Sequence, residues 1–246
     1  MLPRCVAIIP ARYASSRFPG KPLADILGRP MFWHVYQRAL ECSSIREAYL
    51  ATDHERIYRS AVDLDVPVFM TSKAHESGTD RIMEAARKMD LDPECIVVNI
   101  QGDEPALEPG MLDQLLVPFV SASQANITTL VRSIDSATAE NPDVVKVVIS
   151  ETGRALYFSR SLIPYSQDRQ GSFLGHIGLY AYRMEYLKKF SSLGPSPLEK
   201  SEKLEQLRFL EADIPIHVVQ TEHVSHGVDR PEDISRIVKM LKERRK

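Results

Sequence analysis

The run Cys95-Ile96-Val97-Val98-Asn99-Ile100 decides the fold class of this chain. It is almost continuously apolar, which is typical of a strand covered on both faces and hence of a parallel sheet flanked by helices. The polar segment Gln101-Gly102-Asp103-Glu104-Pro105 follows directly, so it lies at the carboxyl end of this strand. Ligands of parallel α/β sheets bind beyond the carboxyl ends of the strands.

The segments before this strand alternate between strand and helix patterns. Asp53 is placed to cap one of the helices, and Pro30 stands in the first turn of another. Strands are expected at 6–9, 48–52 and 66–70, and helices from 30 to about 42, at 55–62 and from 77 to about 89. Such βα alternation predicts a doubly wound parallel sheet.

The later part of the chain is richer in strands. The turn Glu151-Thr152-Gly153-Arg154 predicts a hairpin. Strands are expected at 127–131, 144–149, 155–159, 176–183 and 214–220, and helices at 197–210 and 230–244. We interpret residues 1–246 as a single domain in which roughly residues 127–200 contain an inserted β-rich lobe.

Composition limits the classes of function. The chain has 246 residues, of which 43% are hydrophobic and 26% charged, as in an ordinary globular protein. A net charge of −2 gives no general attraction to nucleic acid or to an anionic membrane. The start of the chain shows no signal-peptide pattern, and no apolar run approaches the ~18 residues of a membrane span. The three cysteines are scattered, which favours a reducing cytoplasm.

A basic loop follows the first strand. It carries three cations, two hydroxyls and a glycine, namely Arg12, Arg17, Lys21, Ser15, Ser16 and Gly20. Guanidinium and ammonium groups neutralise several phosphate oxygens at once, so the loop suits a polyphosphate. A solvated basic loop is the alternative interpretation of any one of these residues. Neither G-x-G-x-x-G nor G-x-x-x-x-G-K-[ST] is present, which argues against dehydrogenases and P-loop ATPases.

Two carboxylates are candidates to complete this site. Asp103 lies on the same sheet edge as the basic loop, and a carboxylate that faces a polyphosphate usually holds Mg²⁺. Its alternative role is to cap a turn before Pro105. Asp229 is either a second metal ligand or the cap of the last helix. Ser77 begins a helix whose N-terminus favours anions, and Arg81 in its first turn is poorly placed for the helix dipole, which hints at a ligand.

Ordered motifs over nearly the whole chain resemble the cytidylyltransferases that activate Kdo, 3-deoxy-D-manno-octulosonate. The first matches are the basic loop itself, Ala51-Thr52-Asp53, Ser77-Gly78-Thr79-Asp80-Arg81, 99–105 and Val145-Lys146-Val147-Val148. Further matches are 155–160, His176-Ile177-Gly178-Leu179-Tyr180, Leu204-Glu205-Gln206-Leu207-Arg208 and 228–233. The resemblance implies a Rossmann-like, GT-A-like α/β nucleotidyltransferase fold with a mixed, mostly parallel sheet.

The resemblance also implies substrates, a cofactor and residue roles. CTP and Kdo would react to CMP-Kdo and pyrophosphate for lipopolysaccharide biosynthesis, with Mg²⁺ held by Asp103 and Asp229, in a cytoplasmic homodimer. The implied catalytic residues are Arg12, Lys21, Asp103 and Asp229. The nucleotide would contact Arg12, Ser15, Arg17, Lys21, Ser77, Arg81 and Gln101. The inserted lobe would serve sugar binding and dimerisation, and the sugar would contact Gln101, Arg160, His176, Tyr180, Glu205 and Gln206.

Alternatives stay open at several of these positions. Without the resemblance, His176 and Tyr180 are typical of core residues, and Glu205 and Gln206 of a solvent-facing helix surface. The chain also departs from the family pattern, with a short loop before His176 and with Gly175 where an arginine is common. The acceptor is therefore Kdo, its 8-amino analogue (8-amino-3,8-dideoxy-manno-octulosonate) or another sugar acid such as sialic acid. A catalytically silent CTP-binding sensor is the alternative from another class.

Overall fold

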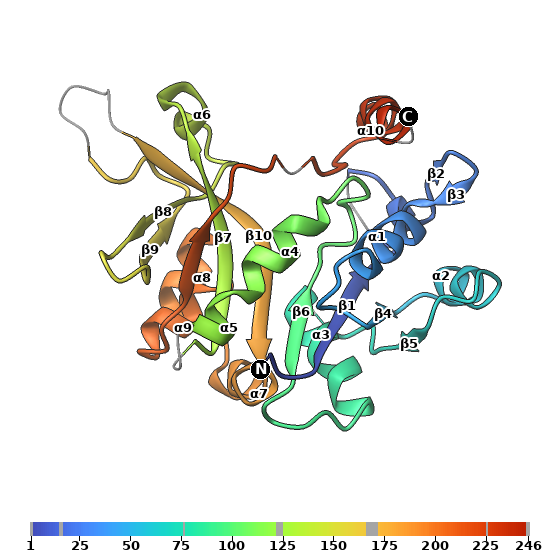
Figure 1. Cartoon of the computed structure of the whole chain (residues 1–246), viewed down its shortest axis with the longest axis horizontal. Coiled ribbons are helices and arrows are strands. Elements are labelled where there is room, and N and C mark those ends of the chain that lie inside the picture. Colours follow the sequence, from blue (N-terminus) through green and yellow to red (C-terminus); the bar gives the residue numbers. More distant parts are fainter. Residues whose placement is uncertain are drawn as a thin grey trace. The chain divides into compact units, whose positions relative to one another are not determined.

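The structure is a computed structural model that describes residues 2–14, 17–75, 77–121, 125–165, 172–224 and 226–244. It contains two compact units (Figure 1). The N-terminal unit comprises Pro3–Asp113 and Val224–Lys246, and the central unit comprises Gln114–His223 with two residues from the chain start. Apart from α4, each helix and strand belongs to one unit.

Four parallel strands form the sheet of the N-terminal unit, in the order β6-β1-β4-β5. Their bounds are β1 (Cys5–Ala11), β4 (Glu47–Thr52), β5 (Val68–Met70) and β6 (Ile96–Asn99). Ile8 in β1 lies beside Tyr49 on one side and Asn99 on the other. Because all four strands run the same way, the segments that follow them leave from one edge of the sheet.

Helices and short elements complete this unit. They are η1 (Lys21–Leu23), β2 (Asp25–Ile26), β3 (Arg29–Pro30), α1 (Met31–Leu40), α2 (Glu55–Val62), α3 (Gly78–Lys88) and α10 (Asp233–Glu243). Val6, Ile8 and Ile9 are completely buried, and α1 and α3 pack on β1 and β4. A second apolar cluster joins α10 to the short elements through Ile26 and Ile237. The burial of apolar side chains on both sides of β1 explains why its sequence is continuously hydrophobic.

The central unit is built on a mixed set of strands. The strands are β7 (Ile127–Ile134), β8 (Lys146–Ile149), β9 (Ala155–Ser159), β10 (Phe173–Arg183) and β11 (His217–Gln220). The helices are α5 (Pro118–Ser121), α6 (Ser136–Glu140), α7 (Met184–Leu193), α8 (Pro197–Glu202) and α9 (Leu207–Glu211). Helix α4 (Pro109–Leu116) begins in the N-terminal unit and ends in the central unit. Strand β7 pairs with β11 in parallel and with β10 antiparallel, and β10 continues through β8 to β9. The predicted β8–β9 hairpin and the mixed α/β fold class are confirmed.

Several local predictions were wrong. The helix expected at 197–210 is two helices, because the backbone of Lys203 turns to φ 56° and ends α8. Asp53 does not cap α2, since the ring of His54 accepts the hydrogen bond from the Arg56 N–H instead. The last helix begins at Asp233 rather than at residue 230. The helices α4, α5, α6 and α7 and the small β2–β3 pair were not predicted.

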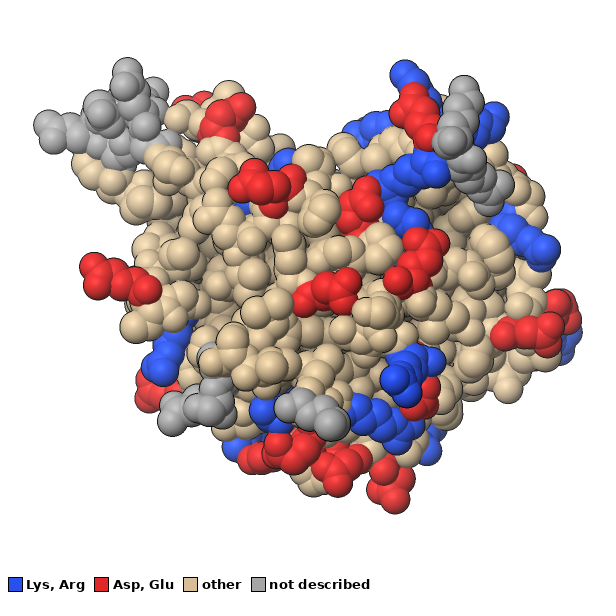
Figure 2. All heavy atoms as spheres, viewed as in Figure 1, with Lys and Arg blue, Asp and Glu red and all other residues tan. Residues whose placement is uncertain are grey.

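Charged side chains of both signs are interspersed over the face drawn in Figure 2, which agrees with the small net charge of the chain. Within the part of the chain that the structure describes, no helix is both long and apolar enough to cross a membrane.

Candidate active site

The basic loop of the N-terminal unit turns sharply back on itself after β1. Gly20 takes a left-handed conformation, with φ 71°, and its N–H donates to the carbonyl of Tyr13 at 2.9 Å. The ring of Tyr13 stacks on His54 at 4.0 Å, and its hydroxyl accepts from Arg56 at 2.8 Å. These contacts tie the loop to the start of α2. Arg12 is exposed, whereas Ser15 lies outside the described residues.

The loop cations pair with the two carboxylates proposed for the metal. Lys21 Nζ lies 2.6 Å from Asp103 Oδ2 and donates to the carbonyl of Val228 at 2.8 Å. Arg17 Nη2 lies 3.0 Å from Asp229 Oδ1. The Lys21 side chain is only 15% exposed, but that of Arg17 is 59% exposed, so solvent screens the second pair far more than the first. The structure thus pairs four of the five charges that the sequence suggested for this site, and Arg12 is the fifth.

Two backbone contacts hold the carboxylates in place. The Val228 N–H donates to the carbonyl of Asp103 at 2.8 Å, which sets the backbones of both carboxylate segments side by side. At Gly102, a Cβ atom would lie 2.5 Å from the carbonyl oxygen of Pro10, so only glycine lets the segments after β1 and β6 approach this closely. Asp103 is therefore fixed at the sheet edge directly beside the basic loop.

Asp229 does not cap the last helix, so that alternative was wrong. The carboxylate of Asp233 accepts the N–H groups of Asp229 and Arg230, both at 2.9 Å, and α10 begins only at Asp233. The side chain of Asp229 is left to face Arg17. Asp103 likewise uses its carboxylate on Lys21, a role that a simple turn cap would not require.

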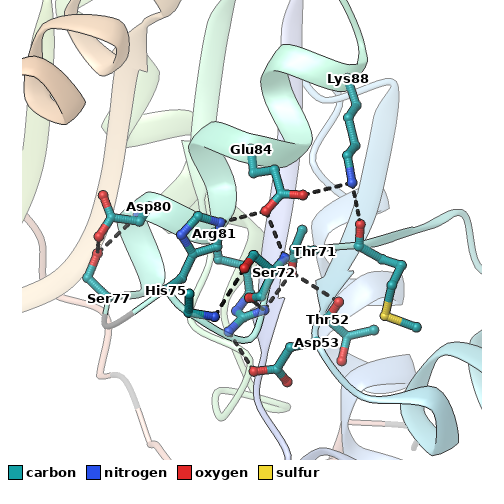
Figure 3. Close-up of polar contacts among 12 residues, drawn as sticks. Thr52, Asp53, Thr71, Ser72, His75, Ser77, Asp80, Arg81, Glu84 and Lys88 are labelled. Carbon is teal, nitrogen blue, oxygen red and sulfur yellow. Dashed lines mark hydrogen bonds and ion pairs between the residues drawn. The ribbon is translucent and has the colours of Figure 1, made fainter.

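Arg81 is completely buried and organises the ends of two strands (Figure 3). Its guanidinium donates to Asp53 Oδ2 at 2.8 Å and to the hydroxyl of Thr71, which in turn donates to the carbonyl of Thr52. Burial lowers the pKa of Arg81, the carboxylate of Asp53 opposes this shift, and the nearby charge of Arg12 lowers the pKa further. Arg81 thus links α3 to the segments after β4 and β5, and it lies close enough to Arg12 of the basic loop to be affected by its charge.

The start of α3 is held by a second set of polar contacts in the same view (Figure 3). Ser77 caps the helix, since its hydroxyl accepts from the Asp80 N–H at 3.0 Å. Burial alone would raise the pKa of Glu84, but hydrogen bonds from Lys88, Ser72 and His75 lower it to about 2. Ser77 therefore has a structural partner, and its predicted contact with a nucleotide stays a prediction. Gln101 is half-buried directly after β6.

All sugar-site candidates except Gln101 belong to the central unit, which brings several of them close together. His176 Nε2 and the Thr129 hydroxyl share a hydrogen bond of 2.9 Å. The centre of the His176 ring lies 5.3 Å from that of Tyr180 and 5.1 Å from that of Phe158. Burial raises the pKa of Tyr180, and the nearby carboxylate of Glu205 raises it further. Arg160 follows β9, the strand that carries Phe158.

Glu205 and Gln206 do not lie on a helix face, because the chain breaks at Lys203 before α9 begins. Gln206 is the residue that precedes the first turn of α9 and is only 9% exposed. Its side-chain Nε2 has no hydrogen-bond partner among the described residues. A buried amide that lacks a partner is costly, so this donor is suited to a bound hydroxyl or carbonyl group.

The surroundings of His176 predict a pH effect on stability. Burial lowers the pKa of its imidazole from 6.5 to about 3, so the folded protein holds the neutral ring. Below pH 6.5 the unfolded chain binds the proton more readily, so this contribution to the free energy of unfolding declines as pH falls toward 3. Urea denaturation measures the free energy of unfolding at about pH 7 and at about pH 5. The decrease between the two pH values should be smaller for His176→Gln than for the unchanged protein. Equal losses would contradict the neutral buried ring.

Sequence reasoning missed three side chains that support the predicted site residues. Asp53 was interpreted as a helix cap, whereas it is the partner of Arg81. Lys146 is a lone lysine in an apolar strand, and that isolation was the available signal. Glu202, the last residue of α8, accepts hydrogen bonds from the Ser159 hydroxyl and the Arg160 N–H at the end of β9.

The two carboxylates fit a magnesium ion by their chemistry. Mg²⁺ prefers oxygen ligands and usually keeps waters and substrate phosphate oxygens in its coordination shell. Asp103 and Asp229 supply carboxylate oxygens on adjacent backbone segments, next to a loop of cations. Among the described residues, no three acidic, histidine or cysteine side chains form a self-sufficient metal site.

A parallel sheet whose strand ends carry a cationic loop and opposed carboxylates defines a nucleotidyltransferase, and comparisons with known proteins agree. Residues 6–216 match the cytidylyltransferase family. The chain is 57% identical to a 3-deoxy-manno-octulosonate cytidylyltransferase of Nitratidesulfovibrio vulgaris, over 97% of this chain and 96% of that protein. A relative of the same name from Geobacter metallireducens is 44% identical over 97% and 98%. The chain belongs to the cytidylyltransferase family, among the 3-deoxy-manno-octulosonate cytidylyltransferases.

Solved structures support the same assignment. A CMP:2-keto-3-deoxy-manno-octonic acid synthetase complexed with CTP is 40% identical, with a TM-score of 0.92 over 98% of this chain and 99% of that chain. A 4-diphosphocytidyl-2C-methyl-D-erythritol synthase is only 11% identical, with a TM-score of 0.65 over 97% and 99%, and it shares the fold alone. The Rossmann-like nucleotidyltransferase fold expected from the sequence is confirmed.

Proposed function

We propose that this protein transfers CMP from CTP to the anomeric hydroxyl of Kdo and releases pyrophosphate. The observation that carries the proposal is the pairing of Lys21 with Asp103 at the sheet edge, in a chain related along its whole length to proteins named for this reaction. The related synthetase with bound CTP supports the choice of nucleotide. The product would serve lipopolysaccharide biosynthesis.

The reaction needs positioned charges rather than a protein nucleophile. The hydroxyl oxygen of the sugar forms a bond to the α-phosphorus, the bond to the bridging oxygen of the β-phosphate breaks, and the hydroxyl proton passes to solvent. Lys21 and Arg12 offset the charge on the leaving pyrophosphate, and Arg17 lies beside them.

Magnesium is part of this proposal. Asp103 and Asp229 are the residues that would hold it. When bound, the ion would neutralise phosphate charge and lower the pKa of a coordinated hydroxyl. Lys21 and Arg17 currently occupy these carboxylates, so both cations must change partners from carboxylate to phosphate when the nucleotide binds with its metal.

The sugar acid is assigned to the central unit. Arg160 would bind the carboxylate of the sugar, since guanidinium and carboxylate groups match in geometry and charge. His176, Tyr180 and Glu205 would line the same pocket, and Gln206 supports the proposal with its buried, unpartnered amide donor. Gln101 would contact both the nucleotide and the sugar. We include in the proposal a cytoplasmic homodimer in which the lobe at roughly residues 127–200 supplies dimer contacts and part of the sugar site, with Arg160, His176 and Tyr180.

A pyrophosphate-release assay tests the proposal. CTP and Mg²⁺ should give steady release with Kdo and much less with sialic acid, and ATP, GTP or UTP in place of CTP should give little. The 8-amino analogue of Kdo is run in parallel, and faster release with it would reassign the acceptor. Binding of CTP without release with any of the three sugars would overturn the proposal and favour a nucleotide sensor.

A further inference from the structure

Lys146 is a buried cation whose partners are all backbone carbonyls. It is 0% exposed and lies in β8 between valines. Its ammonium donates to the carbonyls of Asn141 at 3.1 Å, Val144 at 2.6 Å and Arg160 at 2.6 Å, which uses all three of its donors. Burying an ammonium group costs free energy that carbonyl dipoles offset only in part. An apolar residue would fill this strand position without that cost.

The carbonyl of Arg160 connects this lysine to the predicted sugar site. Lys146 fixes the carbonyl of Arg160, and Glu202 fixes its N–H, since Glu202 Oε2 accepts that N–H at 2.9 Å. The guanidinium is also held, because Nε donates to the carbonyl of Glu202 at 2.9 Å and Nη1 donates to the carbonyl of Pro142 at 3.1 Å. Backbone and side chain of Arg160 are therefore both constrained, from β8 on one side and α8 on the other.

The charges around Arg160 are unbalanced in a way that favours an anion. Burial lowers the pKa of Lys146, the nearby guanidinium of Arg160 lowers it further, and the carboxylate of Glu202 opposes both. Two cations and one carboxylate are thus close enough to influence one another. The Glu202 carboxylate accepts hydrogen bonds from the Ser159 hydroxyl and the Arg160 N–H, and a longer one from the Tyr157 hydroxyl at 3.4 Å.

We propose that Lys146 and Glu202 are positioning residues that hold Arg160 ready for the carboxylate of the acceptor sugar, with Lys146 adding a second, buried positive charge. The inference rests on the proposed function, because it takes Arg160 as the residue that faces the sugar acid. A guanidinium that is already oriented loses less side-chain entropy when it binds a carboxylate. A buried cation behind it is poorly screened by solvent and selects for an anionic acceptor.

The test is a kinetic comparison of variants with Kdo and with its neutral C1 carboxamide. Lys146→Met should raise KM for Kdo by about tenfold or more, with kcat and the KM for CTP within about twofold of the unchanged enzyme. The variant should handle the carboxamide almost as the unchanged enzyme does, because the lost charge matters only to an anion. Lys189→Met removes a solvent-exposed lysine from α7 and is the matched control, with no expected effect.

A second variant covers the case that Lys146→Met does not fold. Glu202→Gln keeps the size of the side chain but places an N–H donor against the Arg160 N–H or the Ser159 hydroxyl, so it should also raise KM for Kdo selectively. An unchanged KM for Kdo in the folded variants, or an equal rise for Kdo and carboxamide, overturns the inference alone. Lack of turnover of Kdo by the unchanged enzyme overturns both the inference and the proposed function.

Discussion

Asp103→Asn is expected to lower kcat at saturating CTP by about a hundredfold or more. The substitution keeps the shape of the side chain but removes the negative charge that faces Lys21 at 2.6 Å. Without that charge the proposed magnesium ion loses a ligand, and Lys21 loses the partner that holds it at the sheet edge. Pyrophosphate release measured over a range of Mg²⁺ and CTP concentrations gives kcat and separates it from weaker binding.

Asp113→Asn is the matched control for this variant. Asp113 is an exposed carboxylate in the same unit that accepts from Cys42 and Ser44, so its neutralisation should leave kcat unchanged. Turnover by Asp103→Asn at nearly the unchanged rate would refute the role of Asp103 in the reaction. Thermal unfolding of each variant distinguishes a lost catalytic charge from a lost fold.

Arg81→Met is expected to lower the free energy of unfolding by about 3–5 kcal/mol. The guanidinium is fully buried, and its removal leaves the Asp53 carboxylate, whose side chain is 16% exposed, without its partner. The Thr71 hydroxyl loses a contact in the same step, so the ends of β4 and β5 lose their connection to α3. Urea denaturation measures the change.

Two further variants test the physical cause. Lys88→Met breaks a partly exposed ion pair with Glu84, in which the two side chains are 45% and 25% exposed, and should cost about 1 kcal/mol or less. The double variant Asp53→Asn, Arg81→Met lacks the carboxylate that Arg81→Met leaves uncompensated. It should therefore be less destabilised than Arg81→Met alone. A cost for Arg81→Met no larger than that for Lys88→Met would contradict a buried, structural ion pair.

Much of the fold and part of the site followed from the sequence. The continuous apolar run at 95–100 predicted a parallel strand with both faces covered, and β6 has that environment. The spacing of turn residues predicted the β8–β9 hairpin. Asp103 was placed beside the basic loop because parallel strands end at one edge, and the structure puts its carboxylate on Lys21.

The features that the sequence did not reveal depend on long-range contacts. Helix propensity carried the expected helix through Lys203, whereas the αL backbone at that residue ends α8. Local capping preference assigned Asp53 to α2, but a buried guanidinium 28 positions along the chain is a stronger partner for it. Lys146 lies in a matched motif and Glu202 in none, but neither received a role from the sequence, because each acts on backbone atoms of another segment.

The ion pairs of the basic loop bear on how fast a ligand is captured. Lys21 and Arg17 are neutralised by Asp103 and Asp229, so that part of the loop presents little unbalanced charge to a distant polyanion. Long-range steering needs such unbalanced charge, and it fades beyond about 8 Å at physiological salt. The association rate of a nucleoside triphosphate should therefore vary weakly with ionic strength. In the proposed reaction, these cations would recognise the phosphates only at contact distance, by exchanging their carboxylate partners for phosphate oxygens.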